Sequence, residues 1–243
     1  MNLAEMLTFT ASEFLDDRTE LISGDPDSLW SDELLVRYFN EGQRILARRS
    51  WCIIDEGNAH AGVIVLATGK VVYPLHKSVL RVLLAVPTDQ EWPLAHADNR
   101  VLRTSRPFDD WIFDVNDVST SSPGRPIAFS TNAGTRIARL YREPTADENG
   151  LRLVLTVARL PVTWLTLDDT EAEPEVPEDY HFLVCQYAAG RCLTQPTVDG
   201  QQKTDGRLLL AEFNEGCKEA RQDRQRAEMH SSCWGFDTAT ALL

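Results

Sequence analysis

The chain has 243 residues, of which 43% are hydrophobic and 8% aromatic, enough to bury one sizeable core or to divide it between two closely packed sub-domains. Its formal net charge of −13 at pH 7 disfavours a protein that grips nucleic acid, because phosphate binding requires clustered Lys and Arg. No apolar run approaches the roughly 18 uncharged residues of a membrane span, and the acids Glu5 and Glu13 argue against a secretion signal at the N-terminus. We therefore expect a folded protein that is made in a cytoplasm and has no membrane partner. Its acidity by itself fits a soluble surface better than a lining that DNA slides past.

The first third of the chain has the pattern of two helices. Ser31 is a good N-cap, and Asp32 and Glu33 after it favour the positive end of a helix dipole. A shorter helix is expected over Ala4 to Asp17, with a turn at residues 24–27 before the longer one. In the longer helix apolar residues recur at helical spacing and predict a buried stripe: Leu34, Leu35, Tyr38, Phe39, Ile45 and Leu46.

After Asp55 the pattern changes to strands. Ala61 to Ala67 and Lys70 to Tyr73 are rich in Val and Ile and meet at Thr68-Gly69, which predicts a β-hairpin. Four further stretches have strand composition and are separated by turn residues: Val79 to Val86, Ile127 to Thr131, Arg136 to Tyr141 and Leu151 to Leu160. The third of these does not alternate strictly, so we expect it to be bulged or buried on both faces. The long stretch from Thr88 to Gly124 is expected to be an irregular surface loop anchored by four aromatic residues: Trp92, Phe108, Trp111 and Phe113.

The last third returns to helices. An acidic connector, residues 168–175 with further acids up to Asp179, is broken by Pro174 and Pro177. Pro177 suits the start of a helix because its missing amide hydrogen costs nothing in the first turn, so we expect a helix from Glu178 to about Leu193. A longer helix is expected from Gly206 to about Met229.

The C-terminal segment, residues 231–243, has no helical or alternating pattern. It nevertheless carries four large apolar side chains: Trp234, Phe236, Leu242 and Leu243. Such a segment is either a frayed terminus or an arm that docks on another subunit.

Side chains capable of chemistry are present, but they form no catalytic or metal-binding motif. His181, Cys185 and Cys192 could share one helix face, yet no CxxC pair or HExxH accompanies them, and thiols at helical spacing are usually core residues. Adjacent acids, as at Asp168 and Asp169, point apart rather than at one substrate atom. Gly-rich phosphate loops and the GxSxG motif are missing. We expect no catalytic residue, no metal and no cofactor.

The cysteines and tryptophans are both scattered along the chain. The cysteines are odd in number, which fits reduced thiols rather than a disulfide framework: Cys52, Cys185, Cys192, Cys217 and Cys233. The tryptophans could in principle form a sugar-binding platform, but their dispersal favours core or interface positions: Trp30, Trp51, Trp92, Trp111, Trp164 and Trp234.

Three stretches of the chain carry a resemblance to a known family through their order and spacing. The first runs from Leu29-Trp30-Ser31-Asp32 to Asn40-Glu41-Gly42-Gln43 in the predicted long helix. The second runs from Lys70-Val71-Val72-Tyr73 to Val79-Leu80-Arg81-Val82, and the third is Glu175-Val176-Pro177-Glu178-Asp179-Tyr180-His181 with Leu183-Val184 and Ala188-Ala189. Together they resemble the head-to-tail adaptor proteins of tailed phages, the group that includes the tail tubular A-type proteins. In that family they are similar, in turn, to the opening helix, to the strands that start a β-rich insertion and to the helix that returns to the helical part.

This resemblance implies a structural virion protein and not an enzyme. It implies a ring of identical subunits, commonly a dodecamer, that joins the portal protein to the tail tube or nozzle protein and surrounds DNA without reading its sequence. Other virion roles, such as a tail-completion or minor capsid protein, stay open, as do a glycan-binding and a glycan-hydrolysing tail module.

The expected fold is α+β, with a helical bundle of N- and C-terminal helices and an inserted antiparallel β-rich domain. We expect the bundle to comprise residues 1–55 and 176–230, the β-rich insertion 56–167, the acidic connector 168–175 and a docking tail 231–243. The expected bundle core is Leu34, Leu35, Tyr38, Phe39, Ile45, Tyr180, Leu183 and Phe213. The residues expected to dock on the portal are Trp234, Phe236, Leu242 and Leu243.

Overall fold

The structure is a computed structural model that contains both helices and antiparallel sheets, which confirms the expected α+β class. It describes residues 1–16, 29–58, 61–89, 93–96, 123–132, 136–196 and 198–233; for 95–96, 132 and 228–233 it describes the backbone alone.

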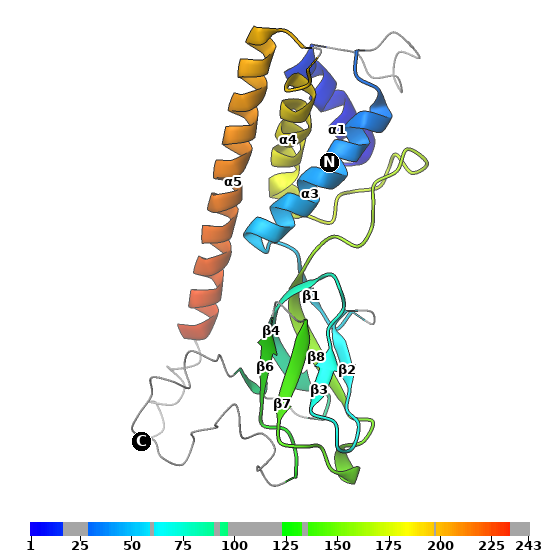
Figure 1. Cartoon of the computed structure of the whole chain (residues 1–243), viewed down its shortest axis with the longest axis vertical. Helices are drawn as coiled ribbons and strands as arrows, with labels where there is room; N and C mark the ends of the chain where they lie inside the picture. Colours follow the sequence, from blue (N-terminus) through cyan, green and yellow to red (C-terminus); the bar gives the residue numbers. More distant parts are fainter. Residues whose placement is uncertain are drawn as a thin grey trace. The chain divides into compact units, whose positions relative to one another are not determined.

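The chain divides into two compact units (Figure 1). One consists of Met1–Ile53 together with Leu160–Leu243, and the other is Ile54–Arg159. We call them the helical unit and the β unit. Two segments far apart in the sequence thus build the helical unit, whereas the β unit is one continuous stretch.

The helical unit begins with α1 (Leu3–Thr10), continued by the π-helical turn η1 (Ala11–Leu15). Asn2 and Glu5 form a capping box at the start of α1, in which each side chain binds the other residue's backbone N–H. The next helix, α3 (Asp32–Ser50), is capped as expected, because the Ser31 hydroxyl accepts a hydrogen bond from the N–H of Leu34.

The C-terminal part of the helical unit contributes a 3₁₀ turn, η4 (Glu178–Tyr180), followed by α4 (His181–Leu193) and α5 (Gly200–Cys233). The last helix therefore starts before the expected Gly206. The Asp199 carboxylate accepts a hydrogen bond from the N–H of Gln202 at 2.9 Å, so this residue caps the earlier start.

Two glycines allow α4 and α5 to cross closely. A Cβ atom at Gly206 would lie 2.7 Å from Cβ of Leu193, and one at Gly190 would lie 2.8 Å from Cγ of Leu210. Because neither position has room for a methyl group, the backbones of the two helices approach in a way that larger residues would prevent.

The β unit contains two four-stranded sheets. In the first, β8 (Arg152–Arg159) pairs along one edge with β4 (Val79–Pro87) and along the other with β1 (Ile54–Glu56) and β2 (Val63–Val65). In the second, the order is β3 (Val72–Pro74), β7 (Ile137–Tyr141), β6 (Ala128–Asn132) and β5 (Ala95–His96). Inward-facing residues of both sheets, such as Leu155 and Leu140, belong to one apolar core.

The expected hairpin at Thr68-Gly69 is wrong. Gly69 does adopt the left-handed turn conformation (φ +75°), but β2 pairs with β8 and β3 pairs with β7, so the turn leads from one sheet to the other. The local pattern correctly predicted two strands and a turn. It could not predict their partners, because Ile64 and Tyr73 both face a core that the two sheets share.

Two further strand expectations have definite outcomes. The pairing of β7 with β6 is regular, while its consecutive residues Leu140 and Tyr141 are both buried, so this strand is buried on both faces and not bulged. Among the strands that the structure describes, all pairs are antiparallel except β5 and β6, which run parallel. Within the part of the chain that the structure describes, no helix has the length and apolar character needed to cross a membrane.

Candidate functional site

The expected docking residues cannot be placed. Trp234, Phe236, Leu242 and Leu243 lie outside the described residues, which end at Cys233 in the last turn of α5. The aromatic residues expected to anchor the 88–124 segment lie outside them as well: Trp92, Phe108, Trp111 and Phe113.

The residues expected in the bundle core all belong to the helical unit. Leu35, Phe39 and Phe213 are buried, with Phe213 packed against the ring of Tyr187 at 4.9 Å between ring centroids. The other five are partly buried: Leu34, Tyr38, Ile45, Tyr180 and Leu183.

Asn40 joins the two segments of the helical unit. Its buried side-chain amide donates to the carbonyl of Leu165 and accepts from the N–H of the same residue, both at 2.9 Å. Gln43 donates to the Asn40 Oδ1 at 2.9 Å, and a Cβ at Gly42 would lie 2.9 Å from Cδ1 of Tyr187. The Asn40 to Gln43 string therefore has a structural role, as a clamp on the chain that leaves the β unit.

Arg221 fastens α5 to the end of α3. Its guanidinium lies 3.7 Å from the ring centroid of Trp51 and donates to the carbonyl of Arg49 at 3.1 Å. Trp51 itself ends α3 in the left-handed conformation, with φ +60°. A cation that binds the last carbonyls of a helix is favoured by the helix dipole. The mixed charge of α5 thus includes a specific contact as well as a solvated face.

Exposed features of the helical unit make it a surface suited to protein partners. Phe9, Phe14 and Phe182 form an aromatic cluster with ring centroids 5.7 to 5.9 Å apart, and Phe182 is 45% exposed. An open pocket of about 490 Å³ lies between α3 and residues 164–168, with Trp164 on its wall. Exposed aromatic side chains of this kind are common anchors in protein interfaces.

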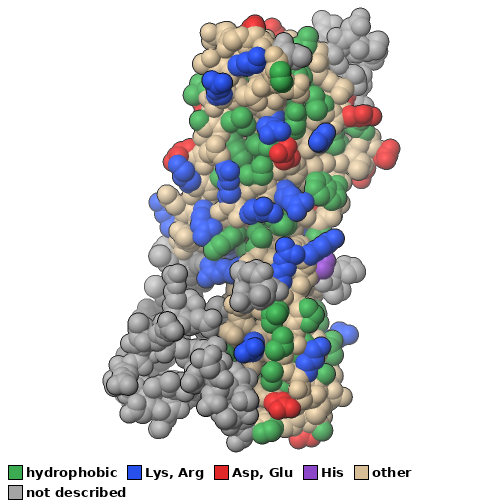
Figure 2. Space-filling view, in the orientation of Figure 1, with side chains coloured by type: hydrophobic (Ala, Val, Ile, Leu, Met, Phe, Trp, Pro, Cys, Tyr) green, Lys and Arg blue, Asp and Glu red, His purple; other side chains and the backbone are tan. Residues whose placement is uncertain are grey.

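Charge is unevenly distributed over the same unit. In Figure 2, Lys and Arg side chains run along the middle of the helical unit, over α3 and α5, whereas Asp and Glu side chains lie mainly at its edges. The protein is strongly acidic as a whole, so this basic face is a local feature that net charge conceals.

The model of the SU10 adaptor protein family matches residues 1–232. The chain belongs to this family. Its membership identifies a structural adaptor protein of a phage particle, as the resemblance implied. No curated protein matches the sequence.

In this adaptor-family chain, the histidine and cysteines that could have formed a metal site belong to the core. Cys185, Cys192 and Cys217 are buried, and burial raises their thiol pKa values to about 11, about 12 and about 11. Within the described part of the chain, no three His, Cys, Asp or Glu side chains gather in a way that could hold a metal ion. The described cysteine thiols, including Cys52, are free.

His181 is held by two polar partners. Its Nε2 lies 3.0 Å from the carbonyl of Val176 and its Nδ1 lies 3.0 Å from the N-terminal ammonium of Met1. Because a carbonyl can only accept and an ammonium can only donate, the neutral ring carries its proton on Nε2. Burial, together with the Met1 charge, lowers the pKa of His181, although the Val176 carbonyl and two nearby glutamates oppose the shift.

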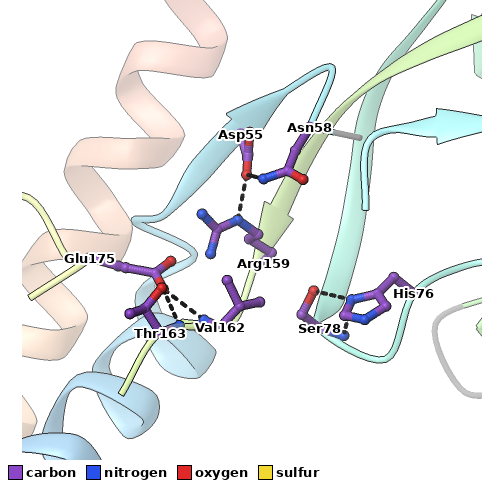
Figure 3. Close-up of polar contacts among 8 residues, drawn as sticks. All are labelled: Asp55, Asn58, His76, Ser78, Arg159, Val162, Thr163 and Glu175. Carbon is purple, nitrogen blue, oxygen red and sulfur yellow. Dashed lines mark hydrogen bonds and ion pairs between the residues drawn. The ribbon is translucent and has the colours of Figure 1, made fainter. Parts of the chain in front are cut away.

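The polar contacts in Figure 3 are structural. In the β unit the Arg159 Nε lies 2.6 Å from the Asp55 Oδ2, so an ion pair joins the first and last strands of the sheet. His76 Nδ1 and Ser78 Oγ lie 2.7 Å apart, but the two residues are only two positions apart in the chain, so the contact is local to one turn. Ser78 is also buried. A serine nucleophile would need an accessible hydroxyl, so this pair serves the turn.

A carboxylate in the connector has a comparable structural role. In the helical unit the Glu175 carboxylate accepts hydrogen bonds from the N–H groups of Val162 and Thr163 (Figure 3). It thereby ties the end of the connector back to the segment that precedes it.

The sequence alone did not predict the Asn40 clamp, the Arg221 contact and the glycine crossing. A signal existed for the first, since Asn40 is a polar residue inside the predicted helix, directly after the apolar Phe39. No local signal predicts the Arg221 contact or the close crossing of α4 and α5, because both depend on which faces of two helices pack against each other.

Proposed function

We propose that the chain is one subunit of a head-to-tail adaptor ring, a dodecamer, in a tailed-phage virion. The ring joins the portal protein to the tail tube or nozzle protein and surrounds the channel through which DNA passes without sequence-specific binding. The match of the adaptor family model over residues 1–232 is the observation that supports this proposal.

The division of the chain into two units suggests how these tasks are shared. In this proposal the bundle, residues 1–55 and 176–230 with the acidic connector 168–175, contacts neighbouring subunits. The β-rich insertion, residues 56–167, faces the tail. The tail segment 231–243 docks on the portal through Trp234, Phe236, Leu242 and Leu243, which follow the end of α5 at Cys233 in the sequence.

The proposed role requires no chemistry, cofactor or metal. Burial moves the thiol pKa values further above neutral pH, so these thiols stay protonated, and a protonated thiol is a poor nucleophile and a poor metal ligand. The polar pairs of the β unit hold strands and turns. Both observations support a structural protein rather than an enzyme.

Native mass spectrometry of the chain with its cognate portal protein tests the proposal. We expect the chain to join the portal ring in a fixed multiple. A chain that does not bind the portal under any ionic condition would contradict the adaptor function and would favour another virion role.

Deletion of residues 231–243 tests the docking segment. We expect the shortened chain to keep its fold, measured by circular dichroism, and to lose portal binding. Val65→Ala is the matched control, because Val65 is an exposed apolar residue, 54% accessible, on β2 of the β unit and therefore outside the proposed portal-binding segment. Portal binding that survives the deletion would overturn the assignment of the tail, and loss of binding in the control would show that exposed apolar residues elsewhere contribute.

A further inference from the structure

Three arginines form an exposed basic stripe on α3. Arg37, Arg44 and Arg48 are spaced at i, i+7 and i+11, which places them on one face of the helix over roughly 16 Å. All three are exposed, and none forms an ion pair within the described part of the chain. By contrast, Arg49 beside them binds Asn214, so it is not part of the stripe.

The acidic connector carries the opposite charge on the same unit. Residues 160–180 contain seven acids and no Lys or Arg. Three of the seven have polar partners: Glu171 with Asn2, Glu175 with the N–H groups of residues 162 and 163, and Glu178 with the Met1 ammonium. The remaining four are exposed and form no ion pair with any described residue: Asp168, Asp169, Glu173 and Asp179.

Each copy therefore presents unpaired charges of both signs on separate elements. Arg37 and Asp168 even line the same open pocket without forming an ion pair. A surface of this kind is complementary to another copy of itself when the copies are arranged head to tail, which is the heterologous contact that closes a ring. Charge complementarity between two surfaces mainly sets orientation and register.

We propose that the arginine stripe of α3 binds the acidic connector of a neighbouring copy of this chain. This inference rests on the proposed ring and adds the contact that would close it. DNA phosphates are the other candidate partner of a basic stripe. They are less favoured, because the net charge of −13 repels DNA from the protein as a whole and three arginines offset little of it. The acidic connector, by contrast, carries the opposite charge to the stripe.

Charge reversal distinguishes this contact. One variant carries Arg44→Glu and Arg48→Glu, which makes the stripe acidic; the other carries Asp168→Lys and Asp169→Lys, which makes part of the connector basic. Self-association is measured by sedimentation velocity at low ionic strength, and loading on the cognate portal is measured by native mass spectrometry. We expect each variant alone to self-associate about tenfold or more weakly than the wild type, since like charges then face each other.

The decisive sample is the mixture of the two variants. In the mixture, the acidic stripe of one variant can bind the basic connector of the other, and the unchanged surfaces of the two variants can also bind. We therefore expect assembly to return, with the two variants present in equal number. Arg139→Glu with Arg152→Glu is the matched control, because both arginines are exposed on the β unit and the change in net charge equals that of the stripe variant. The control should assemble like the wild type, and circular dichroism should show that all variants are folded.

The contact is overturned if the reversed variants assemble like the wild type or if their mixture does not regain assembly. It is also overturned if the control variant loses assembly to the same extent as the stripe variant, or if the wild-type chain stays monomeric both alone and with the portal. A stripe variant that loses only affinity for duplex DNA would assign the stripe to DNA. Charge-dependent self-assembly by a chain that ignores the portal would support this contact while contradicting the adaptor function, so the two proposals fail separately.

Discussion

The helical unit and the β unit differ in what they bury. Of the eight buried polar or charged side chains among the described residues, seven lie in the helical unit and one, Ser78, lies in the β unit. The core of the β unit is an apolar cluster drawn from both sheets. The β unit is one continuous segment in which backbone ladders set the geometry. The helical unit joins two distant segments, and buried polar contacts such as those of Asn40 determine how they meet.

The largest expected effect is loss of apolar packing in the β unit. Leu155→Ala on β8 removes a fully buried side chain, and we expect it to lower the free energy of unfolding by about 2–5 kcal/mol through lost transfer energy and a cavity. Leu84→Ala is the control, because Leu84 lies on the paired strand β4 and is 47% exposed. Urea unfolding measures both, and equal losses would show that β8 is not the centre of this core.

The second prediction concerns the crossing of α4 and α5. Gly206→Ala places a methyl group 2.7 Å from Cβ of Leu193, so the helices must separate, and we expect a cost of about 1–3 kcal/mol. The same substitution at Gly200, where a Cβ meets nothing within 4 Å, should be neutral or slightly stabilising. Thermal unfolding of both variants tests this. A stable Gly206→Ala variant would contradict the close approach.

A third prediction sharpens the contrast in polar burial. Asn40→Ala leaves the N–H and carbonyl of Leu165 without their side-chain partner, and we expect a loss of about 1–3 kcal/mol in unfolding free energy. Asn214→Ala, at an exposed asparagine that binds Arg49, should change stability by less than about 0.5 kcal/mol. If the two asparagines prove equally dispensable, the clamp does not hold the two segments together.

The smallest expected effect is a pH dependence of the helical unit. The folded protein lowers the pKa of His181, so the unfolded chain binds this proton more readily and stability rises with pH in that range. The contribution is fully present above the ordinary histidine pKa of about 6.5 and is lost as the pH falls through the lower folded pKa. Urea unfolding at several pH values should show a weaker acid loss for His181→Gln than for the wild type. An identical pH profile would contradict this assignment.

The elements with strong local signals were predictable. The Ser31 cap and the acids that follow it define the start of α3, and Pro177 with Glu178 and Asp179 marks the return to helix. Pairing between elements was not predictable, as the wrong hairpin at Thr68-Gly69 shows: the same alternating pattern suits either sheet. The predicted start of α5 at Gly206 was also wrong, because the capping residue Asp199 lies before the apolar residues on which the prediction of this helix rested.

The sequence by itself determined the class of the protein: α+β, acidic, free of catalytic motifs and similar in three ordered stretches to phage adaptors, since these properties depend on composition and local order. Only the tertiary structure decided which side chains meet across the two segments of the helical unit. The Asn40 clamp and the packing of Gly206 against Leu193 both depend on distances between residues of different elements. No local pattern encodes such distances, because they arise when the whole core is packed.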